Sequence, residues 1–298
     1  MGVPTKHVLS QLPVLRGMGQ AALSSLTRRP ASGIDPERGG WLEAEIPPRP
    51  ADLVRDYVKH VGGDPAWYRG RLPAHLFPQW GFPLAARALA VLPYPLGRVV
   101  NAGCRIEQRA MLPANEPLRV RARIEKVDDD GHRALVTQRI ETGTESAGMA
   151  LVAEMRTFIP LEKREGKEKK ARPTVPAEAR EIAFSRIPES AGLDFAKLTG
   201  DFNPIHWIAP YARAAGFRSC ILHGFSTLAR AIEALNRARL AGDPGRLSVI
   251  DVRFTRPLVL PARVGVYVDQ NRGIWVGDAH GGGSYLEGRF EAEAEVGR

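Results

Sequence analysis

Cysteine is scarce in this chain, and long apolar runs are missing from it. Among 298 residues there are two cysteines, Cys104 and Cys220, both in apolar stretches. Two thiols cannot form a disulfide framework, so the sequence predicts a protein of a reducing compartment, the cytoplasm, with two buried and unreactive thiols. No apolar run approaches the roughly 20 residues that a membrane-spanning helix needs. The longest nearly uncharged stretch, residues 72–86, contains three prolines and is therefore no membrane helix.

Acidic residues are absent from residues 1–34, which carry lysine, arginine and several serines. Such a composition can mark an organelle transit peptide, but it lacks the continuous apolar core of a secretory signal. The alternative is an amphipathic helix within the basic segment 1–40, packed on the protein or lying on a surface. Its apolar face would hold Val8, Leu9, Leu12, Leu15 and Met18. We favour the helix, because no cleavage site stands out.

Positive charge is in surplus. Lysine plus arginine number 42 against 33 acidic residues, a net charge of +9, which suits a polyanionic partner such as a phosphate-bearing cofactor handle, an acidic carrier protein or nucleic acid. The basic residues are spread along the chain without the stripe that a nucleic-acid surface favours. The 44% hydrophobic and 25% charged content is typical of a soluble globular protein.

The chain also repeats itself, because three segments recur in the same order. The matching pairs are 51–65 with 190–204, 84–89 with 227–232, and 105–114 with 253–262. Each match is weak alone, but their shared order predicts a duplicated domain. A charged, proline-containing stretch between the copies indicates an exposed linker, although its lysines could instead form a binding patch. The predicted organisation is a basic segment (1–40), a degenerate domain (41–160), a linker (161–180) and a catalytic domain (181–298).

Within the second copy, helical signals precede strand signals. A short helix ends at Gly200, and a long helix follows with apolar residues at helical spacing between Phe225 and Leu235. After Gly242 the apolar residues alternate with a period of two, in runs separated by glycine, proline and asparagine. One long helix followed by several antiparallel strands predicts an α+β architecture with a sheet wrapped around the helix.

The residues with reactive side chains concentrate in Gly-Asp-Phe-Asn-Pro-Ile-His, from Gly200 to His206, and in Leu-His-Gly-Phe, from Leu222 to Phe225. The first segment resembles the signature of the MaoC-like, hydratase-2 family, in which Gly-Asp-x-Asn-Pro-x-His carries the catalytic Asp and His. The resemblance covers the second copy and, more faintly, the first. It implies a double hotdog, an α+β fold of two antiparallel sheets each wrapped around a long helix, similar to bacterial 3-hydroxyacyl-thioester dehydratases.

Asp201 and His206 are the expected catalytic residues. An aspartate and a histidine on one tight turn can both reach a single water, one taking its proton while the other orients it or supplies a proton. Gly224 begins the long helix, whose unpaired N–H groups suit an enolate-like oxygen. The expected substrate-binding residues are Asn203, His223, Gly224 and Phe225. Taken singly, Asp201 could be a turn cap, His206 a half-buried histidine with satisfied partners, and His223 a brace for its loop.

The resemblance implies reversible dehydration of (3R)-3-hydroxyacyl thioesters to trans-2-enoyl thioesters, an R-specific enoyl-CoA hydratase activity of fatty acid metabolism. No cofactor is expected, and no metal, because the spacing of Asp201, His206 and His223 matches no familiar ligand pattern. The expected partner is an acyl-CoA or acyl carrier protein substrate, with no nucleic acid and no membrane span, in a monomer or homodimer of double hotdogs. Alternatives are a non-catalytic acyl-thioester-binding protein and a hotdog thioesterase, since fold does not fix function.

The first copy lacks the full signature. Gly63-Asp64 is followed by a proline but by no Asn-Pro-x-His, so we expect a catalytically dead partner. Its aromatic residues, Trp80 among them, are expected to shape the acyl pocket, and the alternative is that they fill the core. Three prolines, Pro73, Pro78 and Pro83, discourage a continuous helix over the front of this stretch and leave room for a tunnel beside it.

Overall fold

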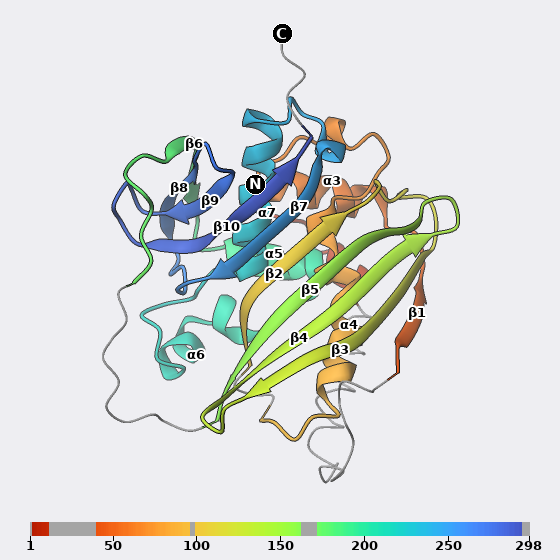
Figure 1. The fold of residues 1–298 in the computed structure, drawn as a ribbon, viewed down its shortest axis with the longest axis horizontal. Coiled ribbons are helices and arrows are strands. Elements are labelled where there is room, and N and C mark those ends of the chain that lie inside the picture. Colours follow the sequence, from red (N-terminus) through yellow and green to blue (C-terminus); the bar gives the residue numbers. More distant parts are fainter. Residues whose placement is uncertain (1, 12–39, 96–98, 162–171, 294–298) are drawn as a thin grey trace.

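The computed structural model describes residues 2–11, 40–95, 99–161 and 172–293, and its strands form one ten-stranded antiparallel sheet (Figure 1). The first half of the chain supplies β1 (Leu42–Ile46), β2 (Val100–Gln108), β3 (Leu118–Asp129), β4 (Arg133–Thr144) and β5 (Gly148–Pro160). The second half supplies β6 (Arg180–Ile187), β7 (Leu247–Phe254), β8 (Ala262–Val268), β9 (Gly273–Gly277) and β10 (Ser284–Ala292). The helices are α1 (His7–Ser10), α3 (Ala51–His60), α4 (Pro78–Leu89), α5 (Ala191–Thr199), α6 (Ala209–Ala214) and α7 (Gly224–Ala238).

The strand order repeats between the halves. It runs β1-β3-β4-β5-β2 and then β7-β10-β9-β8-β6, so that β2 and β7 pair at the centre and join two five-stranded halves. At this junction Gly103 lies opposite Arg253, and a Cβ on the glycine would meet the carbonyl oxygen of Val252 at 2.4 Å. The next residue, Cys104, is fully buried, and Cys220 is buried as well, as the sequence predicted.

The long helices lie on one face of the sheet, and Figure 1 looks onto the other face. Helix α7 forms where the apolar spacing predicted it, and its inward residues Leu228, Ala229 and Leu235 are fully buried. Burying such side chains stabilises the fold by about 25 cal/mol per Å² of apolar area. The opposite face carries ion pairs such as Arg156–Asp251 at 2.6 Å, which links the two halves. The predicted α+β class with antiparallel strands against a long helix is confirmed, and the two sheets that were predicted are joined edge to edge into one sheet.

Helix α4 follows a stretch that forms no continuous helix, as its prolines predicted, but α4 itself contains two of these prolines. It begins at Pro78 and continues through Pro83 to Leu89. A proline in the first turn costs little, because that N–H has no partner within a helix. Pro83 removes one internal hydrogen bond, but Trp80 and Leu84 are nearly fully buried around it. Tertiary packing therefore outweighs the local preference. Trp80 donates through Nε1 to Thr142 Oγ1 at 3.0 Å and lies in the core, not along a tunnel.

Asp64 also has a different counterpart from the one the sequence suggested. It begins the 3-10 helix Pro65–Trp67 and accepts the N–H of Ala66 at 2.9 Å. In the second half Asn203 begins the 3-10 helix Pro204–His206 and accepts the N–H of Ile205 at 3.3 Å. The matching residue of Asp64 is therefore Asn203 rather than Asp201, and Trp67 stands where the second half has His206.

Two predicted segments lie largely outside the described residues. Of the N-terminal segment 1–40, residues 2–11 are described with the short helix α1, while the remaining positions of the predicted apolar face, Leu12, Leu15 and Met18, are not covered. Of the linker, residues 162–171 are not described. Within the described ranges, no helix is both long and apolar enough to cross a membrane.

Candidate functional site

The turn after α5 is built by local residue choices. Gly200 ends the helix in the left-handed conformation, with φ at 83°, as its position in the sequence predicted. The chain then reverses through Asp201, whose carboxylate accepts the N–H of Asn203 at 3.3 Å. Asn203 in turn starts the 3-10 helix that ends at His206. Short-range hydrogen bonds thus place Asp201 and His206 on one turn.

All six residues that the sequence singled out line one cavity of about 290 Å³. Asp201, Asn203 and His206 come from the turn, while His223, Gly224 and Phe225 come from the start of α7. The rest of the lining is mainly apolar: Val99, Val100, Asn101, Ile205, Phe217, Ile221, Leu222, Thr227, Phe254, Thr255, Arg256, Pro257, Leu258 and Tyr285. An apolar pocket with a few convergent polar groups is the usual form of a small-molecule site.

His206 has a defined tautomer. Its Nδ1 lies 2.8 Å from the carbonyl oxygen of Ile221, and a carbonyl only accepts, so Nδ1 carries the hydrogen. The side chain is buried, and this burial lowers the pKa of His206 below the ordinary 6.5. At neutral pH the imidazole is therefore uncharged, and its Nε2 offers a lone pair to the cavity.

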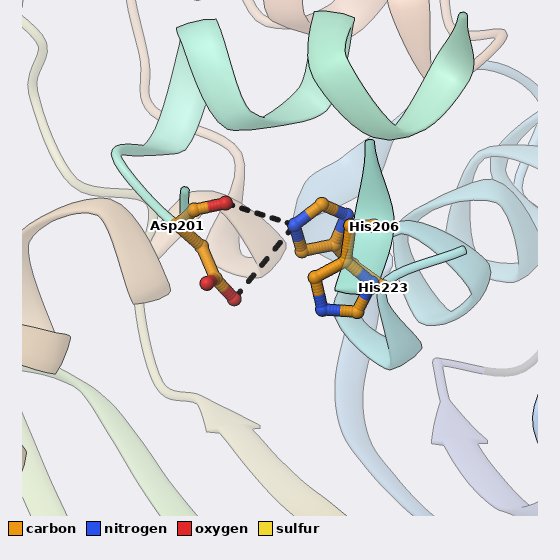
Figure 2. Close-up of side chains that lie close together, drawn as sticks. All are labelled: Asp201, His206 and His223. Atoms are coloured by element: carbon orange, nitrogen blue, oxygen red, sulfur yellow. Dashed lines mark hydrogen bonds and ion pairs between the residues drawn. The ribbon is translucent and has the colours of Figure 1, made fainter. Parts of the chain in front are cut away.

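His223, the residue before α7, connects this helix to the turn from Gly200 to His206. Its Nε2 donates to the backbone carbonyl of Asp201 at 3.0 Å and lies 3.9 Å from that residue's carboxylate (Figure 2). Its ring stacks on that of His206, with centroids 3.6 Å apart and planes inclined by 25°. Burial, followed by the neighbouring His206, lowers the pKa of His223 to about 3. His223 is therefore neutral, and it holds the carbonyl of Asp201 and the ring of His206 at the start of α7.

This buried neutral histidine makes the stability of the protein depend on pH. Its pKa is about 3 in the folded chain against 6.5 when solvated, so the unfolded state binds more protons between these values. The free energy of unfolding should then fall on acidification below about pH 6.5, with a slope of at most about 1.4 kcal/mol per pH unit from this group. Denaturant unfolding of the parent and of His223→Gln, whose amide can still donate to Asp201, measures the slope at pH 7, 6 and 5. Identical slopes in both proteins would contradict this assignment.

The start of α7 offers hydrogen-bond donors to the cavity. The N–H groups of Ser226 and Thr227 turn back to the carbonyl of His223 at 3.0 and 3.1 Å. Those of Gly224 and Phe225 have no partner among the described residues, and both residues line the cavity. Unpaired donors at the positive end of a helix dipole favour an oxygen that carries developing negative charge.

Asp201, His206 and His223 also form the kind of group that could hold a metal ion, with one donor atom from each within 4.8 Å of the others. A metal bound by an imidazole lies close to the plane of that ring, along the nitrogen lone pair. The two rings are stacked with nearly parallel planes, so their lone pairs do not converge on one point. The residues therefore fit a water site better than a metal site.

Activity should accordingly survive chelation. After prolonged dialysis against EDTA, turnover of an enoyl thioester is expected to stay within about twofold of the untreated protein, because the proposed chemistry uses side chains and backbone donors alone. A zinc-dependent hydrolase treated in parallel controls for effective metal removal. Loss of activity that Zn²⁺ or Mg²⁺ restores would overturn the expectation.

Several lining residues were not singled out from the sequence. Val99, Val100 and Asn101 come from the first half, at the start of β2. Arg256 stacks on the ring of Tyr285 at 3.9 Å and donates to the carbonyl of Gly283 at 2.8 Å. No local pattern marks these positions, because they reach the cavity only through the pairing of the sheet. Asp64 and Trp80 are not among the described lining residues.

Comparison with known proteins agrees with this architecture. Residues 162–279 match the family described as MaoC like domain. The chain is 27% identical over 274 residues to 3-hydroxyacyl-thioester dehydratase X of Mycobacterium tuberculosis, covering 90% of this chain and 92% of that protein. The crystal structure of HtdX from the same organism superposes with a TM-score of 0.68 at 21% identity, over 85% of this chain and all of that one. A conserved hypothetical protein of M. tuberculosis with a double hotdog fold has a TM-score of 0.54 at 13% identity, over 85% and 95% of the two chains.

Proposed function

We propose that the chain, whose residues 162–279 match the MaoC like domain, is a hydro-lyase of that family and interconverts (3R)-3-hydroxyacyl and trans-2-enoyl thioesters at Asp201 and His206. The observation that carries this proposal is the meeting of three groups at one cavity. They are the carboxylate of Asp201, the lone pair of neutral His206, and the unpaired N–H groups at the start of α7.

Each group has a task in hydration. A water held between the Asp201 carboxylate and His206 Nε2 attacks Cβ of the enoyl thioester, and His206 takes its proton. Electrons move towards the thioester oxygen, which accepts hydrogen bonds from the N–H groups of Gly224 and Phe225. The imidazolium then returns the proton to Cα. The net change is the addition of H and OH across the double bond, and the protein ends in its starting protonation state.

The cavity also suits a thioester on a phosphate-bearing carrier. Its mainly apolar lining accepts an acyl chain, and the wall beside Tyr285 holds Arg256, whose guanidinium is ion-paired with Asp278. Coenzyme A and an acyl carrier protein both present a phosphopantetheine arm, so both are candidate carriers. A thioesterase and a non-catalytic acyl-binding protein are the competing functions, because hotdog folds host different chemistries.

One assay separates these functions. With crotonyl-CoA as substrate, loss of the enoyl absorbance without release of free thiol is the expected result. Thiol release would identify a thioesterase, and binding without any turnover would identify a binding protein. Inactivity with crotonyl-CoA but turnover of the crotonyl-carrier-protein conjugate would keep the proposed reaction and assign the carrier.

The product of hydration should be the 3R alcohol. The Gly-Asp-x-Asn-Pro-x-His signature from Gly200 to His206 is of the hydratase-2 type, so water should be delivered to the corresponding face of the double bond. Chiral chromatography of the hydrolysed product from trans-2-enoyl-CoA measures the ratio of the two isomers. Predominance of the 3S isomer would refute the assignment of the reaction type.

A further inference from the structure

Residues 2–11, here called the N-terminal arm, are built into the protein between the two halves. The arm contacts α3 of the first half through an ion pair of Lys6 with Asp52 at 2.5 Å and a hydrogen bond between His7 Nε2 and Asp56 at 2.8 Å. Gln11, the last described residue of the arm, is fully buried. A polar side chain buried this deeply costs free energy unless it is hydrogen-bonded, so its partners are informative.

Gln11 caps the C-terminal end of α5, the helix that precedes the turn from Gly200 to His206. Its Nε2 donates to the carbonyl of Leu198 at 3.0 Å and to that of Lys197 at 3.2 Å. The carbonyls of the last turn of an α-helix have no partner within the helix, and here a side chain distant in the sequence supplies one. Only Thr199 and Gly200 separate these carbonyls from Asp201.

The side-chain amide of Gln11 is also hydrogen-bonded through its oxygen to the first half of the chain. Gln79, in the first turn of α4, donates through Nε2 to Gln11 Oε1 at 3.1 Å, and Arg49 donates to Gln79 Oε1 at 3.1 Å. Both ends of the Gln11 amide are thus engaged, which fixes its orientation. A chain of hydrogen bonds runs from Arg49 through the two glutamines to the end of α5.

The arm has a second attachment to α5. The N–H of Val3 donates to the Asp194 carboxylate at 3.2 Å, and Lys197 donates both to the carbonyl of Val3 at 3.1 Å and to Asp194 at 3.0 Å. The start and the end of the arm therefore bind the same helix about one turn apart, at Asp194 and at Leu198. The position of α5 relative to the first half depends on these contacts.

We propose that Gln11 is a positioning residue, which sets the place of the Asp201 carboxylate by fixing the C-terminal end of α5 against α4. The inference rests on the proposed function, because its readout is turnover at Asp201. Catalytic geometry is sensitive on this scale, since a displacement of about 1 Å can cost about a hundredfold in rate. The arm lies outside residues 162–279, which match the MaoC like domain.

The test replaces Gln11 by methionine, which has a similar length but no hydrogen-bond donor. In the full-length protein, kcat is expected to fall about tenfold while KM stays within about twofold, because Gln11 contacts the end of α5 and not the cavity. Lys6→Met is the matched control. It removes an arm contact whose lysine side chain is 57% exposed, and it should leave kcat unchanged.

The same change in an Asp201→Asn background decides between positioning and general stability. If Gln11 acts through the carboxylate of Asp201, Gln11→Met should have little further effect once that carboxylate is gone. An equal loss in both backgrounds, or an unchanged kcat in the parent background, overturns the proposal. If the methionine variant does not fold, Gln11→Asn keeps the amide but shortens its reach, and the same pair of backgrounds applies. Full activity of Asp201→Asn alone would instead overturn the proposed function.

Discussion

Replacing Asp201 by asparagine, or His206 by alanine, is expected to lower kcat at least about a hundredfold while the protein stays folded. Asparagine at position 201 can still accept the N–H of Asn203, so the turn should persist while the negative charge beside the water is lost. Alanine at position 206 removes the lone pair that accepts the proton of the water. Steady-state rates with an enoyl-CoA substrate, together with circular dichroism, measure both quantities.

The duplicated chain contains its own control for this experiment. Asp64 begins the equivalent 3-10 helix in the first half and accepts the N–H of Ala66, a task that asparagine also performs. Asp64→Asn should therefore leave kcat unchanged, as expected of a half that takes no part in the chemistry. The catalytic assignment fails if a folded variant of Asp201 or His206 keeps more than about half of the parent activity.

The second large effect is on stability. Trp80→Ala should lower the free energy of unfolding by about 3–5 kcal/mol, because it empties a large volume in the core and leaves the hydroxyl of Thr142 without its donor. Trp80→Phe, which keeps an aromatic ring but loses the hydrogen bond and part of the buried volume, should cost less, about 1–3 kcal/mol. Urea unfolding of the three proteins gives these differences.

The Trp80→Ala variant also tests whether Trp80 shapes the acyl pocket. Phe77 and Phe82, and not Trp80, contact Phe225 at the cavity wall, with ring centroids 5.6 and 5.3 Å apart. The ratio of rates for short and long acyl chains should therefore be the same in Trp80→Ala and in the parent. A stable Trp80→Ala protein with an altered ratio would restore the original interpretation of this residue.

Much of the candidate site follows from sequence alone, because it is built by contacts between near neighbours. Gly200 ends α5 because glycine adopts a left-handed conformation without strain, and Asn203 starts the next turn by bonding to the N–H two residues later. The apolar spacing of α7 places Gly224 at its first residue. Each of these interactions spans only a few residues, so the order of residue types determines them.

Tertiary structure decided what depends on distant pairing. Asp64 matches Asn203, and Trp80 fills a core, because the packing of whole helices settles these positions and overrides local preference in α4. Gln11 reaches the carbonyl of Leu198 across 187 positions of the chain, and Val100 reaches the cavity through the sheet. No periodicity encodes a contact between segments so far apart, because it exists only once both halves have packed. The sequence therefore determined the turn from Gly200 to His206, and the fold determined what surrounds it and holds it in place.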